Sequence, residues 1–162
     1  MGADYLYACD GKWWMYHGDT VKEEFKGECW TTLPDADPGD HRLAIEKYQL
    51  NYVTGSSSER GLANAPNRIT YGGNSGYQAI HLARNFGAAR IILLGYDFGG
   101  KGHWFGEHPQ RLNSGHDFQL WLSTLGHLAG DLAAEGIEVI NCSRETAITC
   151  FSRKSIAEIN IN

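Results

Sequence analysis

The sequence predicts an α/β fold in which helices flank a mostly parallel β-sheet. In its second half, short aliphatic runs alternate with amphipathic segments, and glycines close most of them. The order strand, helix, strand, helix, strand implies parallel pairing through right-handed crossovers. The chain has 162 residues, which fits one domain with one core. We therefore expect residues 1–162 to form a single domain.

The first half gives the weaker signals. Tyr5–Cys9 is a short apolar run that ends at Asp10-Gly11, which predicts a buried strand followed by a turn. Residues 13–16 are expected to form a short helix that Gly18 closes. Two further strand candidates and a polar surface loop follow, at residues 28–32, 42–45 and 52–68.

The second half is clearer. The Gly72–Gly76 turn precedes a helix that ends at Gly87 and has one apolar face. Arg90–Leu94 then reads as a strand buried on both faces, and a long Gly- and His-rich loop follows it. We expect a helix, a strand and a short helix after that loop, at residues 118–133, 137–140 and 145–149.

Net charge, cysteine content and hydropathy indicate which kinds of partner the protein has. The formal net charge of -5 argues against a nucleic-acid binder held by general electrostatics. The four cysteines form no CxxC pair, which favours reduced thiols in a cytoplasmic protein. No signal peptide opens the chain, and the longest aliphatic run, Ile91–Leu94, is too short to span a bilayer. We expect a small-molecule partner and no membrane.

Polar residues gather where the predicted strands end. Ligands of parallel sheets bind outside the carboxyl ends of the strands, and the Gly72–Gly76 turn should lie beside those ends. The sequence therefore predicts one pocket at this edge. The binding candidates are Asp10, Gly73, Asn74, Ser75, Gly76, Gly95, Tyr96, Asp97, Asn141 and Ser143.

Each of these candidates also has a structural interpretation. The Gly72–Gly76 turn would let the free N–H groups of a helix start approach a phosphate, but Asn74 and Ser75 are equally good N-caps. Asp97 would bind a ribose hydroxyl or orient a base, or would only close a turn. Cys142 is better explained as a buried thiol than as a nucleophile.

The loop of residues 100–108 carries the candidate general base. It holds His103 and His108, and histidine suits proton transfer near neutral pH. A carboxylate such as Glu107 or Asp97 would raise its basicity. A metal site on these histidines and His116 is a weaker hypothesis because the spacing matches no standard zinc pattern, so we predict no metal. A solvated loop pinned by its aromatic side chains is the structural alternative.

Several strings resemble a group of uncharacterised phage and prophage proteins with a Rossmann-like domain. The resemblance spans residues 4–151. The strings are residues 7–14, 73–80, 90–98, 102–108 and 138–143. More remotely, their order resembles bacterial sialyltransferases that use a CMP-sugar donor, and the Rossmann-like domain of archaeal pterin diphosphokinases.

The resemblance to sialyltransferases implies a donor site and a base. Asn74–Gly76 and Gly95–Asp97 match the turn and the strand end of those enzymes, and Asn141–Ser143 matches a segment near their nucleotide. His103 or His108 matches the histidine that serves there as general base. The implied donor is a nucleotide sugar, CMP-linked in those enzymes, and no further cofactor is implied.

Two departures from the pattern bear on activity. The tyrosines that hold the donor phosphate in the sialyltransferases have no counterpart after Phe98. Related proteins also carry a strand and a Gly/Asn-rich turn before the segment at Tyr5, so we expect the sheet to lack its first strand. Either the start lies too far downstream, or this version has lost part of the donor site.

Three hypotheses follow. The first is a phage-derived, sialyltransferase-like glycosyltransferase acting on an unknown acceptor in the host cytoplasm. The second is an inactive module that binds a nucleotide or sugar phosphate. The third is a Mg²⁺-dependent pyrophosphoryl transferase, for which Asp10 and Asp97 are the acidic candidates. An exposed sheet edge would also favour a homodimer.

Overall fold

The computed structural model describes residues 2–36, 38–57, 60–99, 109, 112 and 117–160. The first half of the described chain forms β1 (Tyr5–Tyr7), α1 (Gly11–Glu24), β2 (Glu28–Pro34), α2 (Gly39–Tyr48), β3 (Asn51–Ser56) and β4 (Arg68–Thr70). The second half forms α3 (Ser75–Asn85), β5 (Arg90–Leu93), α4 (Phe118–Ala134), β6 (Glu138–Asn141), β7 (Ser152–Arg153) and the 3₁₀ helix η2 (Ile156–Glu158).

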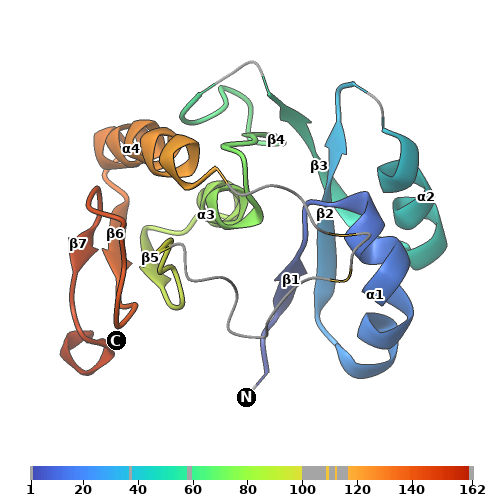
Figure 1. Cartoon of the computed structure of the whole chain (residues 1–162), viewed down its shortest axis with the longest axis horizontal. Helices are drawn as coiled ribbons and strands as arrows, with labels where there is room; N and C mark the ends of the chain where they lie inside the picture. The colour runs from blue at the N-terminus through green and yellow to red at the C-terminus, as the bar shows by residue number, and fades with distance from the viewer. Residues whose placement is uncertain are drawn as a thin grey trace.

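The strands of the described chain form two sheets, and every pairing is parallel. One sheet has the order β1-β2-β3-β4 and the other has the order β5-β6-β7. Helices cover both faces of the first sheet: α1 and α2 lie on one side and α3 lies on the other, and α4 lies beyond α3, next to β6 (Figure 1). The predicted Rossmann-like α/β class is therefore confirmed.

The split between the sheets falls at α3, where we expected one continuous sheet. At the start of α3, Ser75 contacts Cys9, which follows β1, and Gly76 contacts Tyr96, which follows β5. At its other end, the ring of Phe86 lies 5.0 Å from that of Tyr5, and β5 begins four residues later. Both strands thus run alongside α3, and they meet this helix without pairing with each other.

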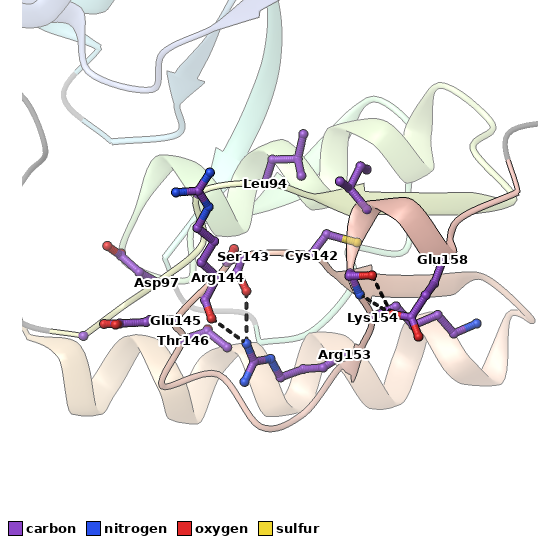
Figure 2. Close-up of a pocket in the computed structure, with 14 residues that line it drawn as sticks. Leu94, Asp97, Cys142, Ser143, Arg144, Glu145, Thr146, Arg153, Lys154 and Glu158 are labelled. Atoms are coloured by element: carbon purple, nitrogen blue, oxygen red, sulfur yellow. Dashed lines mark hydrogen bonds between the residues drawn. The ribbon is translucent and has the colours of Figure 1, made fainter.

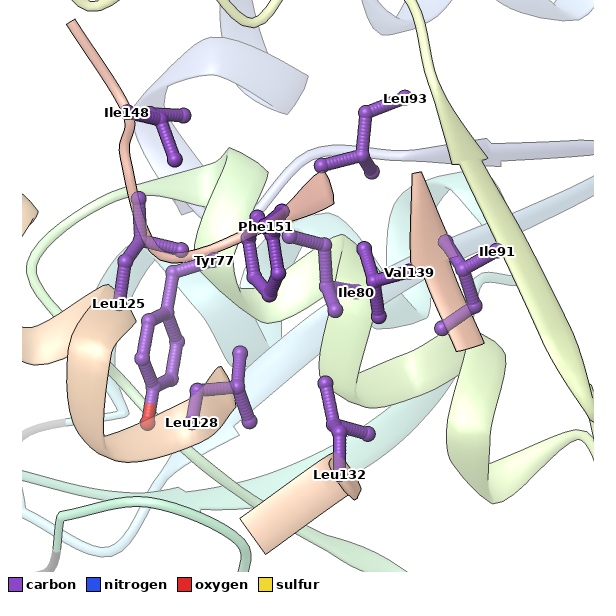
Figure 3. Close-up of a cluster of buried hydrophobic side chains, with 10 residues drawn as sticks. All are labelled: Tyr77, Ile80, Ile91, Leu93, Leu125, Leu128, Leu132, Val139, Ile148 and Phe151. Atoms are coloured by element: carbon purple, nitrogen blue, oxygen red, sulfur yellow. The ribbon is translucent and has the colours of Figure 1, made fainter. Parts of the chain in front are cut away.

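Two main clusters of buried side chains lie on opposite sides of the molecule. One lies among β1, β2, α1 and α2 and centres on Trp14, Ala44 and Tyr48. The other joins α3 and α4 to β5, β6 and the chain after them (Figure 3). α3 serves both sides of the split, because Ile80 belongs to this second cluster and Leu82 packs with residues of β3 and β4.

Three of the four long helices have a side-chain cap at their N-terminus. Asp10, Asn74 and Asp117 precede α1, α3 and α4, and each accepts a hydrogen bond from a backbone N–H of the first turn. Such caps satisfy N–H groups that have no partner inside the helix. The turn predicted at Gly72–Gly76 is therefore confirmed as a helix start, whereas Asp10, where we expected only a turn, is the N-cap of α1.

Several predicted elements were wrong in type or length. Residues 42–45 were predicted as a strand but lie in α2. The buried residues of α2, Ala44 and Tyr48, are four positions apart, which is helical spacing. A segment of four residues is too short to show that spacing. Residues 52–68 include most of β3 and the start of β4. The helix predicted at 13–16 runs to Glu24.

No helix forms at residues 145–149. The Thr146 hydroxyl donates to the Tyr96 carbonyl and accepts from the Ile148 N–H, and these bonds fold the segment as a turn. In the described part of the chain, no helix has the length and apolarity that a membrane span requires.

Candidate functional site

The glycine turn before α3 is shaped by its own neighbours. Gly72 and Gly73 have φ values of 54° and 85°, a region that favours glycine. A Cβ on Gly72 would lie 2.1 Å from the ring of Tyr77. Asn74 Oδ1 accepts from the Tyr77 N–H at 2.9 Å, so Asn74 is the N-cap of α3. Within the described residues, the N–H groups of Ser75 and Gly76 have no hydrogen-bond partner.

The end of β1 meets this turn. Ser75 Oγ donates to Cys9 Sγ at 3.0 Å. Burial raises the pKa of the Cys9 thiol, which therefore stays protonated near neutral pH. The neighbouring Asp10 accepts from the Lys12 N–H at 2.8 Å and caps α1. The contact of Ser75 with Cys9 thus joins the start of α3 to the segment between β1 and α1.

Tyr96 connects the same turn to the second sheet. Its hydroxyl donates to the Gly76 carbonyl at 3.1 Å, and its N–H donates to Ser143 Oγ at 2.7 Å. Its carbonyl accepts from Asn141 Nδ2 at 3.3 Å. Burial raises the pKa of the Tyr96 phenol to about 12, which keeps it a neutral donor. The predicted residues Gly76, Tyr96, Asn141 and Ser143 therefore form one continuous network.

The polar side chains at the ends of β5 and β6 form hydrogen bonds with nearby backbone groups. Asn141 is 1% exposed, and its Oδ1 accepts from the Ser143 N–H at 2.9 Å. Asp97 Oδ1 accepts from the Phe98 N–H at 2.6 Å, and the Asp97 carbonyl accepts from the Ala147 N–H at 2.7 Å. These bonds fix the loops that follow β5 and β6.

A cavity of about 1030 Å³ lies among the segments that follow β5, β6 and β7 (Figure 2). Three predicted residues line it: Gly95, Asp97 and Ser143. Leu94 and Ile156 add apolar surface and are 62% and 50% exposed, so solvent reaches the cavity. The other described candidates do not line it, because they lie at the α3 turn, support the network around Tyr96 or, as Asp10 does, cap α1.

Sequence reasoning missed the basic side chains of this cavity, which are Arg144, Arg153 and Lys154. Arg144 lies three residues after the end of β6, Arg153 is the last residue of β7, and Lys154 follows it. Their position at strand ends in a chain of net charge -5 was a signal that could have identified them.

Several predictions lie outside the described residues. These are the general base at His103 or His108, the carboxylate of Glu107, and the weaker metal hypothesis with His116. Among the residues that the structure does describe, no three His, Cys, Asp or Glu side chains group as a metal site.

No protein-family model, curated protein or solved structure matches this chain. The resemblance to phage proteins and sialyltransferases therefore stays a prediction from sequence strings.

Proposed function

We propose that this protein binds a nucleotide or a nucleotide sugar at the carboxyl ends of its parallel strands and acts as a glycosyltransferase-like protein. The observation that carries the proposal is the cavity after β5, β6 and β7, which Tyr96 joins to the N-terminus of α3. Ligands of parallel α/β sheets commonly occupy this edge.

The lining of the cavity suits an amphipathic ligand. Leu94 and Ile156 offer apolar surface for a base or a sugar ring, and Ser143 and Thr146 add hydroxyl groups at the wall. The volume of about 1030 Å³ is at the upper end of typical small-molecule sites. A nucleotide sugar combines apolar ring faces, hydroxyl groups and phosphate in one molecule, so its chemistry matches this lining.

In the transferase form of the proposal, an acceptor hydroxyl attacks the anomeric carbon of the donor sugar. The bond from that carbon to the phosphate oxygen breaks, and the nucleotide leaves with the electron pair. His103 or His108 takes the proton of the hydroxyl. The N–H groups of Ser75 and Gly76 are the candidates to stabilise the leaving phosphate.

A binding module without transfer is the second candidate, and the hydrogen bonds at the strand ends favour it. The side chains of Asp10, Asp97 and Asn141 already accept from backbone N–H groups. These side chains therefore shape loops and are less free to act as catalytic groups or metal ligands, which a pure binding role does not require. The Mg²⁺-dependent pyrophosphoryl transferase is a lesser proposal, because it needs Asp10 and Asp97 as metal ligands.

Calorimetry with CMP-sugars, UDP-sugars and free nucleotides tests the binding. We expect at least one of them to bind the wild type, and we expect Ile156→Asp to abolish that binding by placing a charge on the apolar wall. Leu43→Asp is the matched control, because Leu43 is similarly exposed, at 55%, but lies on α2 outside the cavity. If no member of the panel binds the wild type, the proposal is wrong.

Sugar-transfer assays separate the two forms of the proposal. A transferase should release the nucleotide from its donor, and His103→Ala or His108→Ala should abolish the release without abolishing binding. A binding module should show no release in the wild type. Sedimentation of the same samples tests the further proposal of a homodimer through an exposed sheet edge.

A further inference from the structure

The basic side chains of the cavity come from two neighbouring loops. Figure 2 shows the Arg144 side chain extending toward Leu94, while the Arg153 guanidinium lies beside the backbone of Ser143 and Arg144. The two guanidinium groups thus lie at different parts of the cavity wall. A ligand with more than one anionic oxygen would be able to reach both.

The Arg153 guanidinium is held in place before any ligand arrives. Its Nη2 donates to the carbonyls of Ser143 and Arg144 at 3.0 and 3.1 Å. Nε and Nη1 of the same group make no hydrogen bond to the described residues. A guanidinium fixed on one side presents its remaining donors in a fork that fits phosphate oxygens.

Arg144 adds a second cation. Its side chain forms no hydrogen bond or ion pair with any part of the chain that the structure describes. Long, unpaired cationic side chains at the wall of a cavity attract anions and adapt to them at little structural cost.

The carboxylates of the cavity compete only in part for these cations. Glu158 accepts from both the N–H and Oγ of Ser155 at 2.7 Å, and Asp97 accepts from the Phe98 N–H. Glu145 is the third carboxylate in the cavity lining, and it too already has an interaction partner. None of the three forms an ion pair with Arg144 or Arg153 within the described residues.

We infer that the cavity binds a phosphate or diphosphate group, anchored by Arg153 and supported by Arg144. The inference deepens the proposed function and rests on it for the rest of the ligand, which would be the nucleoside or sugar. It moves the main phosphate contact from the glycine turn before α3 to the loops that follow β6 and β7.

Calorimetry at low salt, with orthophosphate, pyrophosphate, CMP and cytidine as probes, tests this inference. We expect pyrophosphate to bind the wild type and to bind less tightly as NaCl is added. Arg144→Gln should lower the affinity for pyrophosphate by about tenfold or more, because a charged hydrogen bond is lost. Arg42→Gln is the control, because Arg42 is an exposed residue of α2 outside the cavity.

Arg153→Lys gives the second arm, because it keeps the charge and removes the fork. It should also weaken pyrophosphate binding by about tenfold. Arg153 donates to two backbone carbonyls, so Arg153→Lys could also lower stability, and its binding is compared with that of the wild type at the same fraction of folded protein. Arg144→Gln removes no hydrogen bond of the described structure and needs no such correction. The inference is overturned if the wild type binds neither pyrophosphate nor orthophosphate, or if both variants bind them as the wild type does.

The two proposals fail in different ways. If CMP or a nucleotide sugar binds with an affinity that neither arginine variant changes, the phosphate site is wrong and the proposed function stands. If pyrophosphate binding depends on Arg144 and Arg153 but no nucleotide or nucleotide sugar binds, the phosphate site stands and the proposed function is wrong.

Discussion

His81 is a titratable side chain held entirely inside the protein. It is 0% exposed, and the backbone nitrogens of Ala63 and Thr70 lie 3.3 Å from its Nε2 and Nδ1, one of which accepts a hydrogen bond in the neutral ring. Burial is the main cause that lowers the pKa of His81 to about 4, and the charge of Arg84 adds to it. Asp131 and Glu135 act in the opposite direction and are weaker. The folded protein therefore keeps this ring neutral in mildly acidic solution.

This neutral histidine predicts a loss of stability in acid. Below pH 6.5 the unfolded chain binds a proton at His81, whereas the folded protein does not bind it until the pH approaches 4. The free energy of unfolding should therefore fall by up to about 3 kcal/mol between these two pH values. Urea unfolding followed at several pH values measures the loss.

Two variants separate this effect from the titration of other groups. His81→Gln should remove most of the loss, because an amide does not titrate. His127→Gln should leave it unchanged, because His127 is exposed on α4. Equal pH dependence in wild type and His81→Gln would contradict the prediction.

Residue types alone did not decide between ligand binding and loop support. Asp10 and Asn141 were predicted as ligand contacts, and the structure shows that both accept from backbone N–H groups nearby. Asp and Asn favour strand ends and helix starts for either purpose, so a single sequence cannot separate the two. The position of Arg144 and Arg153 near strand ends was a signal for them, but the sequence alone does not show that an arginine faces a cavity.

At the scale of elements, α3 shows what periodicity and caps predict well. The apolar face and the glycines at both ends identified the helix, and its observed bounds are Ser75–Asn85. The same turn holds Ser75 against Cys9 and Gly76 against Tyr96. The position of α3 between the sheets was not predictable, because no local pattern reports which distant strands a helix contacts.

The cap of α3 gives a prediction at this scale. Asn74→Ala should lower the free energy of unfolding by about 1 kcal/mol, because it leaves the Tyr77 N–H without its partner. Asn74→Asp should retain the stability, since aspartate accepts the same bond. Thermal or urea unfolding distinguishes the variants. An alanine variant as stable as the wild type would show that Asn74 does not contribute as a cap.

At the scale of the whole molecule, the parallel α/β class followed from the order of strands and helices, but the two-sheet arrangement did not. β1 and β4 have three residues each, and β7 has two. Strands this short leave weak patterns, and pairing depends on contacts between distant residues. The carboxyl edge was predicted because parallel strands share one direction, whereas the cavity depends on loops whose path the sequence pattern does not specify.

The prediction of one domain depends on α3. Leu82 is 4% exposed and packs with Val53 and Ile69 of the first sheet, while Ile80, two residues earlier, packs with the cluster of the second sheet. If this shared helix couples the two sheets, they should unfold together.

Leu82→Ala tests the coupling through hydrogen exchange of backbone amides. The lost packing should reduce the free energy of unfolding by about 3 kcal/mol. Although Leu82 packs on the first sheet, the reduction should be equal at Val53 in β3 and at Ile140 in β6, because amides that exchange through global unfolding share one free energy. Leu43→Ala, a change of an exposed side chain on α2, should alter neither. Loss of protection at Val53 with full protection at Ile140 would instead divide the protein into two units at α3.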